Sequence, residues 1–133
     1  MKTILFLCTG NICRSPMAEA FANCYGADVL TALSAGLAPA QSIPANTVRA
    51  MSEMDIDVSN HVPRLYNPFE AVDCNLVVNM SGYKLPGLPP KDVIEWEVPD
   101  PFGFPMETYR MARGDLEQRV MRLILDLRRS GKR

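Results

Sequence analysis

Apolar residues occur along the chain in continuous runs that alternate with stretches of helical spacing. The continuous apolar run at 3–7 predicts a strand that is buried on both faces, and the segments 29–34 and 76–80 also predict strands. Between 93 and 98 apolar and acidic residues alternate instead. That alternation predicts a half-exposed strand at the edge of the sheet.

The stretches between these runs predict helices. Pro16 is a residue favoured at the first helical position, and the segment 17–24 after it favours a helix that ends at Tyr25-Gly26. Further helices are expected at 44–54, at 70–73 and at 106–127. The last of these carries one apolar stripe, formed by Tyr109, Ala112, Leu116, Val120, Leu123, Ile124 and Leu127.

Alternating strands and helices predict an α/β fold with a parallel sheet covered by helices on both faces. Ligands in such folds bind at the carboxyl ends of the strands. The length of 133 residues predicts one domain over 1–133 with a sizeable core. The proline-rich segment 86–90 and the segment 99–105 are expected to be loops of that domain.

Charge and cysteine content exclude several classes of partner and compartment. With 14 basic and 15 acidic residues the net charge is −1, which predicts neither nucleic acid nor a membrane as partner. The apolar start of the chain is too short for a secretory signal, and no stretch is long enough to span a membrane. The cysteines at 8, 13, 24 and 74 lack metal-site spacing, so a cytoplasmic protein with reduced thiols is expected.

The loop after the first predicted strand reads Cys8-Thr9-Gly10-Asn11-Ile12-Cys13-Arg14-Ser15. Backbone N–H groups wrapped around the positive end of a helix bind anions, and the same field favours a thiolate over a thiol at Cys8. Arg14 can bind two oxygens of a phosphoryl group with its planar fork. Gly10 and Asn11 tolerate the positive backbone angles that such a loop requires. The loop therefore predicts a phosphate site with Cys8 as nucleophile.

Two further features refine this chemistry. Ser15 is expected either to cap the helix or to donate its hydroxyl to the sulfur. The Gly-x4-Gly-Lys pattern of a nucleotide-binding loop is absent, which argues against magnesium-dependent nucleotide hydrolysis.

Asp100 is the candidate general acid. It follows a predicted strand and stands between Pro99 and Pro101, which stiffen its loop. A carboxyl group there could protonate the leaving oxygen of a phosphate ester and then activate water against a cysteinyl phosphate.

These residues resemble the low-molecular-weight protein tyrosine phosphatase family, whose motif is matched by residues 6–20. Further matches are Ser34-Ala35-Gly36, Pro44-Ala45, Ile56-Asp57, Ser59, His61, Arg64 and Asp100-Pro101. The resemblance implies a three-layer sandwich in which helices flank a four-stranded parallel sheet, with the phosphate-binding loop after the first strand. It also implies that neither a metal nor an organic cofactor is needed.

The resemblance also implies roles for single residues. Cys8 would be the nucleophile, Arg14 the phosphate clamp and Asp100 the acid and base. Asn11 would organise the loop with support from Ser34, and Ser15 would donate to the sulfur. Cys13 resembles a reversible disulfide partner of the nucleophile, while a small residue packed under the loop is the alternative.

Two departures from the family pattern affect the expected substrate. Phe102 and Gly103 stand where eukaryotic members carry tyrosines, and Ser81 replaces an acidic residue. Phe102 and Phe104 could still form an exposed apolar lip for an aromatic substrate. The connection from 82 to 93 is also expected to be short.

The expected function is hydrolysis of a phosphate monoester through a cysteinyl phosphate, with inorganic phosphate as product. Phosphotyrosine in a protein or an aryl phosphate is the expected substrate, and phosphoarginine, a small ester and arsenate stay open. Cys24 and Cys74 are expected in or near the core, His61 in a structural hydrogen bond, and Trp96 in the core.

Two alternatives share the loop. One is a thiol-dependent arsenate reductase, because arsenate has the charge and shape of phosphate. Such enzymes resolve a disulfide with cysteines after the third strand, where this chain has Ser81 and no cysteine, so a small-molecule thiol would have to replace them. The other is a phosphate-binding module without turnover.

Overall fold

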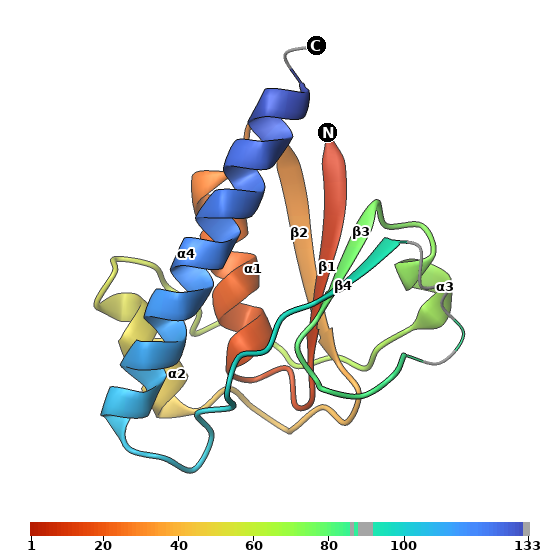
Figure 1. The fold of residues 1–133 in the computed structure, drawn as a ribbon. Coiled ribbons are helices and arrows are strands. Elements are labelled where there is room, and N and C mark those ends of the chain that lie inside the picture. The colour runs from red at the N-terminus through yellow and green to blue at the C-terminus, as the bar shows by residue number, and fades with distance from the viewer. Residues whose placement is uncertain (86, 88–91, 132–133) are drawn as a thin grey trace.

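The computed structural model describes residues 1–85, 87 and 92–131 and contains a parallel sheet between two layers of helices (Figure 1). Its elements are β1 (Lys2–Cys8), α1 (Arg14–Tyr25), β2 (Leu30–Gly36), α2 (Ala45–Ser52), α3 (Pro68–Ala71), β3 (Leu76–Asn79), β4 (Val93–Glu95) and α4 (Met106–Ser130). The strand order is β2-β1-β3-β4, and all three pairings are parallel. The expected α/β class with a four-stranded parallel sheet is confirmed.

The central strand β1 divides the core into two parts. Ile4, Phe6 and Cys8 face the larger cluster, which includes side chains of α1, α2 and α4. Leu5 and Leu7 face a smaller cluster on the other side, which includes Ala71 of α3. This alternation explains why the strand is apolar from Ile4 to Cys8, because both of its faces are buried there.

The register of the sheet places the carboxyl ends of β1, β2 and β3 next to one another, close to the loop that follows β1. Cys8 pairs with Gly36, and Leu7 pairs with Asn79. A Cβ atom on Gly36 would lie 2.8 Å from the carbonyl oxygen of Thr9 and 2.9 Å from the backbone nitrogen of Asn11. Glycine at the end of β2 therefore allows the loop after β1 to pass close to the sheet.

The observed element ends differ from the expected ones where tertiary contacts decide. The strand β4 stops at Glu95, not at residue 98, because β3 already ends at Asn79 and leaves it no partner beyond Trp96. The helix α1 begins at Arg14, so Pro16 lies within the first turn, where no N–H is needed. The helix α4 continues to Ser130, and Arg128 near its end pairs with Asp28 at 2.9 Å.

Cys24 was expected near the core, and this prediction is wrong because its side chain is exposed. The inward face of α1 is formed by Met17, Ala18, Phe21 and Ala22, and position 24 lies outside that face. Cys74 is buried as expected. Trp96 is only partly buried and packs against the larger cluster.

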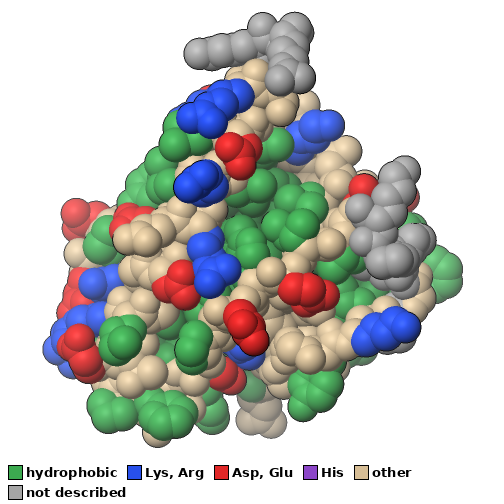
Figure 2. Space-filling model, in the orientation of Figure 1, with side chains coloured by type: hydrophobic (Ala, Val, Ile, Leu, Met, Phe, Trp, Pro, Cys, Tyr) green, Lys and Arg blue, Asp and Glu red, His purple; other side chains and the backbone are tan. Residues whose placement is uncertain are grey.

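The surface mixes both signs of charge with apolar patches over the face drawn in Figure 2. None of the helices within the described residues is long and apolar enough to cross a membrane. Within the expected loop at 86–90 only Gly87 is described, and residues 86 and 88–91 of the connection from 82 to 93 lie outside the described residues.

Candidate active site

The loop after β1 turns sharply at Asn11. Its φ of 55° lies in the left-handed region, as expected for this position, whereas Gly10 does not adopt a positive φ. The prediction of a positive angle at Gly10 is therefore wrong. A Cβ atom on Gly10 would lie 3.3 Å from the Ile12 side chain, so the limited space at this position favours glycine.

The fully buried side chain of Asn11 ties the loop to three segments. Its Nδ2 donates to Ser15 Oγ at 2.8 Å and to Ser34 Oγ at 3.0 Å. Its Oδ1 accepts the backbone N–H of Arg64 at 3.0 Å. The carbonyl of Asn11 accepts from His61 Nε2 at 2.8 Å, so the expected structural hydrogen bond of the single histidine is confirmed.

Ser15 contacts the sulfur of Cys8 and does not cap the helix. The Oγ and Sγ atoms lie 2.9 Å apart, and α1 has no side-chain cap. Because Asn11 Nδ2 donates to the same Oγ, the hydroxyl hydrogen is available to the sulfur. A hydroxyl that donates to sulfur stabilises the thiolate relative to the thiol.

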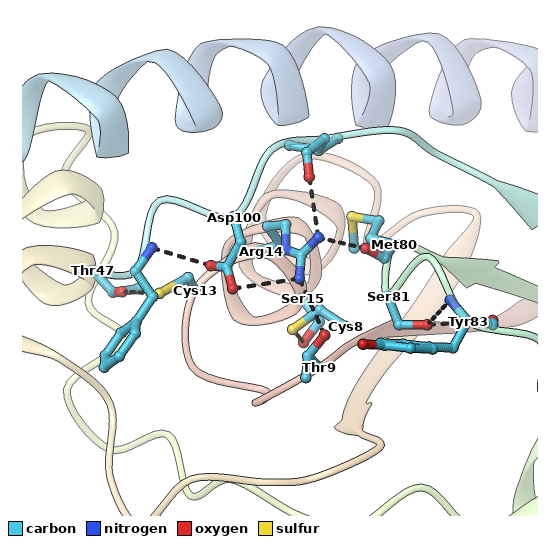
Figure 3. A network of polar contacts seen from close by, with 12 residues as sticks. Cys8, Thr9, Cys13, Arg14, Ser15, Thr47, Met80, Ser81, Tyr83 and Asp100 are labelled. Atoms are coloured by element: carbon cyan, nitrogen blue, oxygen red, sulfur yellow. Dashed lines mark hydrogen bonds and ion pairs between the residues drawn. The ribbon is translucent and has the colours of Figure 1, made fainter. Parts of the chain in front are cut away.

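Arg14 is buried and oriented by backbone carbonyls (Figure 3). Its Nη1 donates to the carbonyls of Met80 at 2.5 Å and Val98 at 3.1 Å. Its Nη2 lies 3.5 Å from Thr9 Oγ1 and 3.6 Å from Asp100 Oδ2. Its buried Nε has no hydrogen-bond partner among the described residues. Since a buried donor without an acceptor is costly, this N–H suits an anion.

A small cavity of about 200 Å³ brings the candidate nucleophile Cys8 and the candidate acid Asp100 together. It is lined by Cys8, Thr9, Gly10, Ile12, Cys13, Ala40, Asp100 and Phe102. The Asp100 side chain is half-exposed, and its Oδ1 accepts the backbone N–H of Phe102 at 3.1 Å. The side chains of Asn11, Ser15 and Ser34 do not line the cavity, and they support the loop through the hydrogen bonds of Asn11.

The two aromatic residues proposed as a lip differ in position. Both side chains are exposed, Phe102 at 57% and Phe104 at 59%, but only Phe102 lines the cavity. No cluster of three or more His, Cys, Asp or Glu side chains that could hold a metal occurs in the part of the chain that the structure describes.

Cys13 sits under the loop as a buried free thiol. Burial raises the pKa of this thiol to about 11, against smaller opposing effects of its hydrogen bonds with Thr47 and Tyr109. The Thr47 hydroxyl lies 3.5 Å from its sulfur and the Tyr109 hydroxyl 4.0 Å from it. The raised pKa keeps this thiol protonated at neutral pH. Cys13 also lines the cavity of Cys8, and a reversible disulfide between the two stays a prediction.

Two further residues of the site, Thr47 and Glu19, had no role predicted from the sequence, although Glu19 lies within the motif at 6–20. Thr47 of α2 is fully buried and donates to the carbonyl of Ile12 at 2.9 Å. Glu19 of α1 accepts from Ser34 Oγ at 2.9 Å, and burial raises its pKa. In both cases the available signal was a polar residue on the inward side of an amphipathic helix.

Comparisons with known proteins agree with this geometry. The model of the family described as low molecular weight phosphotyrosine protein phosphatase matches residues 3–133. A glutaredoxin arsenate reductase of Synechocystis sp. is 35% identical over 129 residues, which cover 93% of this chain and 97% of the relative. An arsenate reductase of Bacillus cereus is 34% identical, with coverage of 91% and 92%.

Solved structures of both activities share the fold. An arsenate reductase in the phosphate-binding state superposes with a TM-score of 0.88 at 32% identity, covering 96% of this chain and 99% of the other. An arginine phosphatase from Geobacillus stearothermophilus superposes with a TM-score of 0.86 at 28% identity, with coverage of 98% and 95%.

Proposed function

Since the chain belongs to the low-molecular-weight phosphotyrosine protein phosphatase family, we propose that Cys8 attacks the central atom of a tetrahedral oxyanion held by the loop after β1. The observation that carries this proposal is the unpartnered Nε of Arg14, a buried donor of a guanidinium whose Nη2 lies close to Thr9 and Asp100 in the lining of the Cys8 cavity. An oxyanion would satisfy this N–H, and the backbone of the loop would bind its other oxygens.

Reduction of arsenate by an external thiol is the first candidate for the complete reaction. It is supported by relatives at 34–35% identity that are named arsenate reductases. The Cys8 thiolate would form a bond to arsenic(V) as a hydroxide leaves and is protonated to water. A thiolate of the reductant would then attack the sulfur of Cys8, and the electron pair of the breaking S–As bond would stay on arsenic, which leaves as arsenite. A second thiol of the reductant would release Cys8 from the mixed disulfide.

The reductant has to come from outside the chain. The segment 81–95 after β3 contains no cysteine. Cys13 is buried with a raised pKa, and Cys74 packs in the smaller cluster beyond the sheet. Cys24 is exposed but lies near the other end of α1 from the loop. Such chemistry needs a reducing compartment, which fits the expected cytoplasmic location.

Hydrolysis of a phosphate monoester, the first expectation from the sequence, is the second candidate. It is supported by the position of Asp100 in the same cavity as Cys8. A protonated Asp100 could donate to the leaving oxygen as Cys8 bonds to phosphorus, and the carboxylate could then activate water to cleave the S–P bond. Phe102 would favour an aryl ester such as phosphotyrosine by contact with its ring.

The two candidates are separated by parallel assays on the purified protein. Arsenate consumption is followed with reduced glutathione plus glutaredoxin and with thioredoxin, and para-nitrophenyl phosphate hydrolysis is followed without metal. Arsenate turnover that needs both an external thiol and Cys8 supports the first candidate, and ester hydrolysis alone supports the second. Phosphate binding without either turnover contradicts both and leaves a binding module.

A further inference from the structure

Asn79, the last residue of β3, is buried, and the two residues after it, Met80 and Ser81, line a second cavity together with Arg14. We infer that Asn79 is a positioning residue for Arg14 and acts through the tight turn that follows β3. This inference rests on the proposed role of Arg14 as the anion clamp. In this inference Ser81, which stands in place of the acidic residue of the family pattern, helps to hold the turn.

The side chain of Asn79 closes this turn with both of its polar atoms. Its Oδ1 accepts the backbone N–H of Ser81 at 3.0 Å and the Ser81 hydroxyl at 2.7 Å. Its Nδ2 donates to the carbonyl of Tyr83 at 2.7 Å, and Glu95 Oε1 lies 3.3 Å away. Ser81 Oγ in turn accepts the backbone N–H of Tyr83 at 3.1 Å. Asparagine is suited to such a turn because its side chain bonds to the backbone two residues on.

Met80 connects the turn to the guanidinium (Figure 3). Its N–H donates to the carbonyl of Leu7 at 2.7 Å and so continues the ladder with β1. Its carbonyl does not continue into another strand pair and instead accepts from Arg14 Nη1. The conformation of the turn therefore fixes the direction of the Met80 carbonyl.

The orientation of Arg14 depends on that direction. Nη1 of Arg14 donates to the carbonyls of Met80 and Val98. With Nη1 held in this way, Nη2 lies near Thr9 and Asp100, and Nε has no partner among the described residues. A planar guanidinium binds an oxyanion bidentately only when its plane is held. Loss of the Asn79 turn should let the Met80 carbonyl move, and the grip on the anion should weaken.

The reactivity of Cys8 should not depend on Asn79. The Ser15 hydroxyl contacts the sulfur and is held by Asn11 of the same loop, and within the described residues no hydrogen bond joins Cys8, Ser15 or Asn11 to the turn after β3. Anion affinity and thiol reactivity are therefore separate readouts. A general loss of stability would change both, whereas misorientation of Arg14 would change only the first.

The experiment measures alkylation of Cys8 by iodoacetamide with and without inorganic phosphate. The variants are Asn79→Ala and Ser81→Ala, and the control is Asn75→Ala near the other end of β3, where Asn75 Oδ1 accepts the N–H of Thr3 at 2.8 Å. We expect Asn79→Ala to raise the dissociation constant of phosphate about five-fold or more, with an alkylation rate without phosphate that stays within about two-fold of the parent. Ser81→Ala should change affinity in the same direction, and Asn75→Ala should change neither readout.

An unchanged phosphate affinity in Asn79→Ala would overturn the inference. A fall in the alkylation rate without phosphate as large as the fall in phosphate affinity would overturn it as well. If Asn79→Ala fails to fold, the same comparison is decided by Ser81→Ala, which removes only one hydroxyl. Failure of phosphate to protect Cys8 in the parent would contradict the proposed anion site itself, so the two failures are distinguishable.

Discussion

The sulfur of Cys8 and the hydroxyl of Ser15 lie 2.9 Å apart across the loop that joins β1 to α1. Both atoms are buried, and Asn11 holds the hydroxyl from the other side at 2.8 Å. The turn at Asn11 thus brings the end of a strand and the start of a helix around one sulfur atom. This contact gives the thiolate its nearest side-chain donor.

Replacing Ser15 by alanine tests that contact. Ser15→Ala removes the donor to sulfur and leaves Asn11 Nδ2 with one acceptor fewer, so we expect alkylation of Cys8 near neutral pH to slow about five-fold or more. The rate is measured with iodoacetamide and peptide mass spectrometry. Ser52→Ala, at the exposed end of α2, is the control and should react like the parent. Equal rates in all three proteins would exclude a role of Ser15 at the sulfur.

The four thiols should differ in reactivity. Iodoacetamide at about pH 7.5 should modify Cys8 and the exposed Cys24 but leave Cys13 and Cys74 unmodified. Burial raises the pKa of Cys13 to about 11 and also raises that of Cys74, so both thiols stay protonated. Cys8 is buried as well, but its sulfur has the Ser15 hydroxyl 2.9 Å away. Modification of Cys13 at the rate of Cys8 would contradict this description of the loop.

An acid-sensitive contact joins α2 to α4. Glu53 binds Arg110 at 2.8 Å and Arg113 at 2.7 Å, and these hydrogen bonds lower the pKa of the Glu53 carboxyl from 4.5 to about 2. Because the pKa of Glu53 is lower in the folded than in the unfolded protein, its ionised carboxylate stabilises the fold at pH values above 4.5. This stabilisation is lost as pH falls from 4.5 to about 2.

Thermal unfolding of Glu53→Gln tests this pH dependence. Its Tm should lie below that of the parent at neutral pH, by a modest amount because the pair is exposed to solvent. The difference should close as pH approaches 2 and should shrink in high salt. Glu107→Gln, a carboxylate 3.9 Å from Arg110, is the control with little expected effect. A difference that persists at low pH would refute the ionic origin of the effect.

Phe102 should discriminate between substrates. Phe102→Ala is expected to raise KM for aryl phosphates about five-fold or more while small alkyl phosphates change less than about two-fold. Phe104→Ala is the matched control, because Phe104 is equally exposed but does not line the cavity. Equal effects of Phe102→Ala on both substrate classes would show that this ring contacts no aryl group.

Local patterns in the sequence predicted much of the fold and the site. The continuous apolar run of β1 reflects burial on both faces, and the loop from Cys8 to Arg14 lies where a parallel sheet exposes its carboxyl ends. Asp100 was identified by its neighbouring prolines, and the structure places it in the cavity of Cys8.

The contacts that sequence patterns missed join residues far apart in the chain. Thr47 of α2 donates to the carbonyl of Ile12, 35 positions earlier in the chain, and the carbonyl of Met80 accepts from Arg14, 66 positions earlier. Neither Thr47 nor Met80 belongs to the motif at 6–20. The exposure of Cys24 was also missed, because the face that a helix buries is set by the sheet and by α4.

The central claim is that Cys8 forms a covalent bond to the oxyanion centre. The direct measurement mixes Asp100→Ala with para-nitrophenyl phosphate, denatures the protein at neutral pH and locates phosphate by peptide mass spectrometry. This ester has a good leaving group, so the first step should proceed without Asp100, whereas hydrolysis of the intermediate should be slow. We predict phosphate on the peptide that contains Cys8 and none in the Cys8→Ala variant. Product formation without phosphate on Cys8 at any time, or equal turnover by Cys8→Ala, would contradict the claim.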